Sequence, residues 1–176
     1  MEKIQDTVYA FIDSQNLIRG LGNDIVDDDV TIYSGWKLDT RKFYRYLTDK
    51  FHVSKAFYFV GHVPQYEFLY SKLRSDGYQV VYKPTVKDGN GKPKGNVDAE
   101  LVLHASAIEY NNYDKAVFVA GDGDYYCLYK YLNERGKLFK IVIPNRKSES
   151  SLLKEFQSYK VFLEFERSKL EYIKGK

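Results

Sequence analysis

Short runs of apolar residues alternate along the chain with longer segments that carry apolar side chains on one face only. The runs have the length and composition of strands that are buried on both faces of a sheet. They predict strands at residues 8–12, 53–60, 78–82, 116–120 and 138–143. The amphipathic segments predict helices that begin near Asp39, Pro64, Asn96 and Tyr125, with a further helix at 148–158.

The order of these elements predicts an α/β fold. Strands that alternate with helices form a doubly wound, largely parallel sheet, here of about five strands flanked by helices. The 176 residues are enough for one domain, with a core at about 8–144 and a C-terminal helix and tail at 148–176. Within that tail, residues 161–165 are expected to be a short strand or a docking segment.

Two connecting segments have unusual compositions. Residues 20–36 carry Asp24, Asp27, Asp28 and Asp29 without a basic residue, which predicts a solvated loop rather than a metal site. Residues 84–95 are rich in Gly, Pro and Lys and predict a mobile loop. Its lysines form a basic patch, for which contact with phosphate and simple solvation are both open.

The composition limits which partners and which cellular compartment the sequence predicts. The net charge is only +3, from 27 basic and 24 acidic residues, so any attraction for nucleic acid must be local. The single cysteine excludes an internal disulfide and suits a reducing compartment. No apolar leader or membrane-length run is present. We therefore expect a soluble cytoplasmic protein that does not contact membranes.

Four carboxylates follow strands or open a helix in this scheme. Asp13 ends the first strand, Asp98 lies in the first turn of the helix after Asn96, and Asp122 and Asp124 follow the fourth strand. In a parallel sheet these positions share the edge where ligands bind. Carboxylates that are close together favour a hard divalent cation. Each of them could instead cap a helix or shape a turn.

Other common α/β sites lack their sequence motifs. The segment after the first strand reads D-S-Q-N rather than G-x-G-x-x-G, and the chain has neither a P-loop nor a G-x-S-x-G elbow. The three histidines have no zinc-binding spacing and no cysteine partners.

Three segments of the chain form an ordered set of motifs: Y-A-F-I-D-S-Q-N (9–16), K-G-N-V-D-A-E-L (94–101) and F-V-A-G-D-G-D-Y (118–125). Together they resemble the NYN domain family, in the LabA/DUF88-like branch of the PIN-like nuclease superfamily. The resemblance covers about residues 8–144 and implies a PIN-like sheet with strand order 3-2-1-4-5. It also implies Mg²⁺- or Mn²⁺-dependent cleavage of RNA. The residues that would hold the metal are Asp13, Asp98, Asp122 and Asp124, with Asn16 as a supporting polar group in the catalytic site.

The chain departs from the family pattern at two positions. His104 stands where many members carry an acidic residue, and Ala120 stands where the G-D-x-D element is usually preceded by Ser. His104 either packs within the helix or bonds a water at the metal site.

The mechanistic hypothesis is metal-assisted hydrolysis of RNA phosphodiester bonds. Lys92 and Lys94 would hold the RNA backbone, and Tyr125 would stack on a base if its ring is exposed. One alternative is a catalytically weak or inactive NYN module that binds RNA or protein. A small-molecule phosphatase is a further alternative, although such enzymes begin with D-x-D whereas Gln15 follows Asp13 here. A homodimer is compatible with the sequence.

Overall fold

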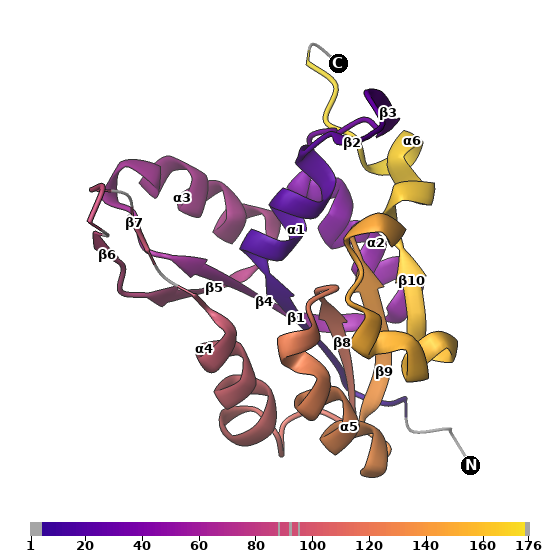
Figure 1. The fold of residues 1–176 in the computed structure, drawn as a ribbon. Coiled ribbons are helices and arrows are strands. Elements are labelled where there is room, and N and C mark those ends of the chain that lie inside the picture. Colours follow the sequence, from indigo (N-terminus) through magenta and orange to yellow (C-terminus); the bar gives the residue numbers. More distant parts are fainter. Residues whose placement is uncertain (1–4, 88, 92, 95, 175–176) are drawn as a thin grey trace.

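A single parallel sheet forms the centre of the molecule in the computed structural model, which describes residues 5–87, 89–91, 93–94 and 96–174. Every pairing in this sheet is parallel. Its six strands have the order β10-β9-β8-β1-β4-β5 (Figure 1). They are β1 (Val8–Asp13), β4 (Val53–Gly61), β5 (Gln79–Lys83), β8 (Lys115–Val119), β9 (Leu138–Ile143) and β10 (Lys160–Phe162).

The predicted α/β fold class is confirmed. The five predicted strands have the expected neighbours, and the observed order differs in detail because β10 adds a sixth strand beside β9. This strand overlaps the first two residues of the segment 161–165, which the sequence left open as a strand or a docking segment. Lys160–Phe162 pair with Ile141–Ile143 of β9, so the C-terminal part of the chain extends the sheet.

Helices cover both faces of the sheet (Figure 1). On one face α1, α2 and α3 pack around Leu17, Phe43 and Leu73. On the other face α4 and α5 pack around Leu101 and Leu128. The strand β1 supplies both cores, because successive side chains point to opposite faces of a strand. The helices are α1 (Ser14–Gly22), α2 (Thr40–Phe51), α3 (Glu67–Asp76), α4 (Asp98–Leu103), α5 (Tyr126–Glu134) and α6 (Arg167–Leu170).

The helix α1 was not predicted from the sequence. Asp13 caps it, since one carboxylate oxygen accepts from the backbone N–H groups of Gln15 and Asn16. Leu17 and Leu21, one helical turn apart, bury its inner face. The helix therefore begins immediately after β1, and its first turn lies at the carboxyl edge of the sheet.

Three other connecting segments differ from the predictions. Residues 84–95, predicted as a mobile loop, contain an antiparallel pair, β6 (Val86–Lys87) and β7 (Pro93–Lys94). The predicted helix at 148–158 forms as 3₁₀ turns at Arg146–Ser148 and Ser151–Tyr159. The helix α4 continues into a π-helical turn at His104–Ile108.

The acidic segment 20–36 forms a small hairpin of β2 (Ile25–Asp27) and β3 (Val30–Tyr33). Asp28 and Asp29 form its tip with φ values of 46° and 60°, a left-handed conformation that Asp tolerates better than most residues. Both side chains are exposed, as the expectation of a solvated segment required.

Candidate metal centre

The centre lies at the topological switch point of the sheet, where the chain connections run to opposite sides of β1. From β1 the chain reaches β4 on one side, and β8 pairs with β1 on the other. Ligands of open α/β sheets bind in the crevice outside the carboxyl ends of such adjacent strands. β1 ends at Asp13 and β8 ends at Val119, so the segments that follow them line this crevice.

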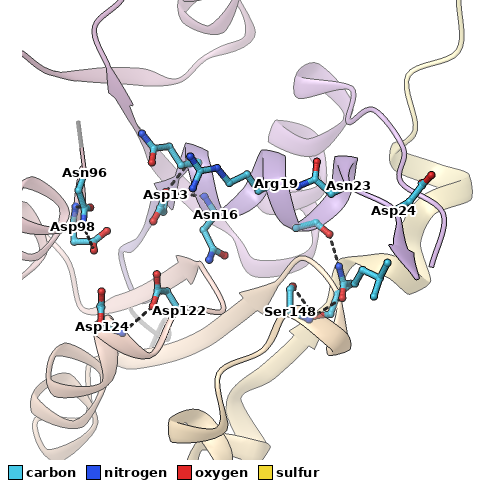
Figure 2. A pocket seen from close by; sticks show the side chains of 14 residues that line it. Asp13, Asn16, Arg19, Asn23, Asp24, Asn96, Asp98, Asp122, Asp124 and Ser148 are labelled. Atoms are coloured by element: carbon cyan, nitrogen blue, oxygen red, sulfur yellow. Dashed lines mark hydrogen bonds between the residues drawn. The ribbon is translucent and has the colours of Figure 1, made fainter. Parts of the chain in front are cut away.

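Three of the predicted carboxylates come together here. Each of Asp98, Asp122 and Asp124 offers an oxygen atom, and these atoms lie within 4.8 Å of one another. Asp98 is the first residue of α4, whereas Asp122 and Asp124 belong to the turn between β8 and α5. Figure 2 shows the three side chains directed toward the same space from two segments of the chain.

The turn after β8 holds its two carboxylates in place. The Asp122 side chain accepts a hydrogen bond of 3.0 Å from the backbone N–H of Asp124. Gly121 precedes them in a site without room for a side chain, because a Cβ there would lie 2.9 Å from Ile143 Cγ2. The predicted supporting residue Asn16 accepts a bond of 2.8 Å from the Gly121 N–H through its Oδ1 atom. Asn16 therefore ties α1 to the turn that carries the carboxylates.

Asp13 reaches the same centre through a tyrosine. Its Oδ1 atom caps α1, and its Oδ2 atom lies 2.9 Å from the hydroxyl of Tyr125. The same hydroxyl lies 2.7 Å from Asp98 Oδ1. Asp13 is thus joined to the group of three by a bridge rather than by direct approach of its carboxylate.

The bridging role corrects the prediction for Tyr125. Its ring is fully buried, with 0% of its surface exposed, so it cannot stack on a nucleobase, and that prediction was wrong. Burial is also the largest cause that raises the pKa of Tyr125, followed by the charge of Asp13. The phenol therefore stays protonated, and its single O–H hydrogen is shared between the two carboxylates, to one of which it donates at a time.

Burial likewise raises the pKa of Asp13 above its usual value. The backbone bonds from Asn16 and Gln15 and the bond from Tyr125 lower this pKa, and the charge of Asp98 raises it further. Desolvation disfavours the charged carboxylate, whereas hydrogen bonds to that form favour it. A positive charge at the centre would offset the first effect.

The remaining predicted residues are two lysines and His104. Lys92 lies outside the described residues, and Lys94 is described only as part of β7. His104 packs against Phe57 and Phe59, with ring centroids 5.9 and 5.3 Å away. Its Nδ1 atom is buried and has no hydrogen-bond partner among the described residues. Of the two interpretations of His104, the packed helix residue is therefore the one that the structure favours.

Several residues of the centre were missed at the sequence level. A cleft of about 660 Å³ contains the carboxylates and extends along α1 past Arg19 and Asn23 to Asn145 and Ser148. The i, i+3 spacing of Asn16 and Arg19 would have placed both on one wall, had α1 been predicted. The signals for α1 were the Asp13 cap and the spacing of Leu17 and Leu21.

The chemistry of the donor set fits a hard divalent cation. The three carboxylates supply oxygen ligands, which Mg²⁺ and Mn²⁺ prefer. Two ligands of one Mg²⁺ ion are at most about 4.2 Å apart, twice the usual Mg–O distance. The observed limit of 4.8 Å needs only small rotamer changes to reach that value. No salt bridge among the described residues neutralises these carboxylates.

Among the described residues, no helix has the length and apolar character needed to cross a membrane. A search of curated proteins found no similar sequence. One solved structure is similar over 93% of this chain and 96% of its own, with a TM-score of 0.69 and 22% sequence identity: a protein of unknown function, VPA0982, from Vibrio parahaemolyticus RIMD 2210633. At that identity the likeness supports the fold alone. The sequence profile described as "NYN domain" matches residues 7–164, and the chain therefore belongs to the NYN domain family.

Proposed function

We propose that this protein is a Mg²⁺- or Mn²⁺-dependent ribonuclease of the LabA/DUF88-like branch, acting in the cytoplasm. The observation that carries the proposal is the approach of Asp98, Asp122 and Asp124 to within 4.8 Å at the carboxyl edge of the sheet. Membership of the NYN domain family supports it, because NYN domains are generally PIN-like nucleases. RNA as the partner and a homodimer as the assembly stay predictions.

The residues of the centre have separate roles in this proposal. Asp98, Asp122 and Asp124 hold the cation. When bound, a divalent cation supplies polarisation of the phosphoryl oxygen and lowers the pKa of a water molecule. Asp13 and Tyr125 set the position of Asp98 through the hydroxyl bridge. Asn16 sets the position of the turn that carries the other two carboxylates.

The test is the rate of RNA cleavage by Asp122→Asn. An asparagine keeps an oxygen that can accept from the Asp124 N–H, so the turn is preserved while one negative charge is removed. We expect wild-type protein to cleave single-stranded RNA with Mg²⁺ or Mn²⁺ and not with a chelator. We expect the variant to lose several kcal/mol of transition-state stabilisation, which corresponds to about a thousandfold in rate.

A matched control is Asp49→Asn, which removes an exposed carboxylate from α2. This variant should cleave RNA at the wild-type rate. If Asp122→Asn also cleaves at the wild-type rate in Mg²⁺, the assignment of the centre is wrong. Wild-type protein that binds RNA but shows no metal-dependent cleavage would instead favour the alternative of a non-catalytic NYN module.

A further inference from the structure

The candidate cleft has two parts of different chemistry. One end holds the carboxylates of the metal centre, and the other is lined by Asn23, Asp24, Asn145 and Ser148, with Arg19 on α1 between the two ends (Figure 2). Arg19 is the cation among the described residues that line the cleft. Among the described residues of this lining, the Arg19 guanidinium is therefore the group that can balance the charge of a bound anion.

Hydrogen bonds and close packing join α1 to the segment after β9 in this part of the cleft. Asn145 is 1% exposed and donates a hydrogen bond to the Gly20 carbonyl of α1. Its Oδ1 atom accepts bonds of 2.8 and 3.0 Å from the N–H groups of Lys147 and Ser148. Gly20 packs closely on Pro144, since a Cβ at position 20 would lie 2.6 Å from Pro144 Cβ. These contacts fix α1 and the segment after β9 to each other, so the shape of this part of the cleft is set by the fold.

The Arg19 side chain is available for a ligand. It is exposed on α1, and Figure 2 shows it running back along the helix toward the end where Asp13 and Asn16 lie. Helical side chains take this direction because they lean toward the amino terminus of the helix. In the described part of the chain, no salt bridge joins Arg19 to a carboxylate.

Most other arginines of the chain are paired with an acidic side chain. Their partners lie 2.5–3.9 Å away, and the pairs are Arg41–Asp76, Arg74–Glu67, Arg135–Glu134, Arg146–Glu164 and Arg167–Glu171. Arg45, which is exposed on α2, shares with Arg19 the lack of a salt bridge among the described residues. Arg45 does not line the cleft, so the two arginines form a matched pair for experiment.

We propose that Arg19 and the part of the cleft around it form a phosphate subsite for the backbone of a single-stranded RNA. The inference rests on the proposed function, because one cleft contains both the metal centre and Arg19, and a strand bound along this cleft would place its phosphates beside Arg19. The planar guanidinium donates two parallel N–H bonds to phosphate oxygens, which a lysine cannot do. The positive charge of Arg19 also offsets the repulsion between the substrate and the carboxylates that line the cleft, which are those of the metal centre and of Asp24.

The test measures binding of a fluorescein-labelled oligouridylate by fluorescence anisotropy, with Ca²⁺ in place of Mg²⁺ and over a range of salt concentrations. Arg19→Ala should weaken binding by about tenfold. It should also reduce the slope of log affinity against log salt by about 0.7, the value for one phosphate contact of a single strand. Arg19→Lys should keep the slope and recover only part of the affinity. Arg45→Ala should match wild type in both measurements.

Parallel cleavage assays in Mg²⁺ separate this inference from the proposed function. If wild-type protein cleaves RNA and Arg19→Ala keeps the wild-type affinity and slope, the subsite is wrong and the nuclease assignment stands. If wild-type protein does not cleave RNA but Arg19→Ala weakens binding with the reduced slope, the subsite stands and the nuclease assignment fails. Wild-type protein that neither binds nor cleaves the oligouridylate overturns both.

Discussion

The buried carboxylate of Asp76 and the three carboxylates of the candidate metal centre have opposite electrostatic surroundings. Asp76, at the end of α3, has a side chain with no exposed surface and lies 2.6 Å from Lys72 Nζ and 3.2 Å from Arg41 Nε. Thr40 donates a further bond of 2.6 Å to it. Asp98, Asp122 and Asp124 instead face one another, with no salt bridge among the described residues.

The difference separates a structural carboxylate from a candidate ligand set. Lys72 and Arg41 neutralise the charge of Asp76, so this carboxylate needs no bound cation. The salt bridge between Asp76 and Arg41 also joins α3 to α2. At the carboxyl edge of the sheet the carboxylates bond to the Tyr125 hydroxyl and to a backbone N–H group. These donors are neutral, so the negative charge of the carboxylates is not balanced. Like charges that stay close together lower the stability of the protein until a cation binds. The comparison predicts that substitutions at the two places have opposite effects on stability.

The largest predicted effect on stability is the response to Mn²⁺. At a free Mn²⁺ concentration of about 100 times the dissociation constant, wild-type protein should gain about 2.7 kcal/mol of unfolding free energy. Asp124→Asn should lose most of this gain and should be more stable than wild type in chelator, because a like charge has been removed. Thermal denaturation with Mn²⁺ and with chelator measures both changes. An Asp124→Asn protein that responds to Mn²⁺ as wild type does would contradict the assignment.

Asp76→Asn should show the reverse behaviour. It should lower the unfolding free energy by about 1–2 kcal/mol at neutral pH, since charged hydrogen bonds are lost while the exposed partners Lys72 and Arg41 limit the cost. RNA cleavage and the response to Mn²⁺ should be unchanged. Urea denaturation of the variant and of wild type gives the difference. A loss of Mn²⁺ response in this variant would mean that the two groups are not independent.

The pH dependence of that difference follows from the pKa of Asp76. Burial raises this pKa, and the bonds from Lys72, Thr40 and Arg41 lower it by more, so that it lies below its usual value of 3.8. The folded state therefore binds fewer protons than the unfolded state, and the stability is fully present above the unfolded pKa. The difference between wild type and Asp76→Asn should shrink as the pH falls through the folded pKa. A difference that does not change between neutral and strongly acidic pH would contradict this account.

The smallest predicted effect concerns His104. Burial lowers its pKa below the usual 6.5, although the charges of Glu109 and Glu100 act in the opposite direction. The unfolded state then binds the proton more tightly, so the stability contributed by the neutral ring falls as the pH drops below about 6.5. His104→Leu should remove this part of the pH dependence without changing the response to Mn²⁺. Denaturation at pH values on both sides of 6.5 tests it, and an unchanged slope would show that the ring is not the cause.

Much of the fold was predictable because buried parallel strands leave a strong apolar pattern. The rule that the carboxyl ends of parallel strands share one edge also placed Asp98, Asp122 and Asp124 correctly in relation to one another. It placed Asp13 only approximately, because the pattern does not reveal that Tyr125 turns inward and separates Asp13 from Asp98. An aromatic residue in the first turn of a helix can face solvent or the sheet, and only packing decides which.

Other features depend on contacts between distant parts of the chain. The helix α1 has only nine residues and an apolar face of little more than Leu17 and Leu21, so its pattern is weak, and the position of Arg19 in the cleft was missed with it. β10 has only three residues, too few for a periodic pattern, and it forms because β9 offers an edge for pairing. The short length of such segments makes tertiary contacts, rather than local preference, decide their structure.

The most direct test of the central claim is a crystal structure of the wild-type protein grown with Mn²⁺, with anomalous diffraction data used to locate the ion. The account predicts an anomalous peak in contact with the carboxylates of Asp98, Asp122 and Asp124, and no such peak in crystals of Asp122→Asn. The account would be contradicted if crystals grown at saturating Mn²⁺ show no anomalous peak at these carboxylates. It would also be contradicted if the peak is unchanged in Asp122→Asn.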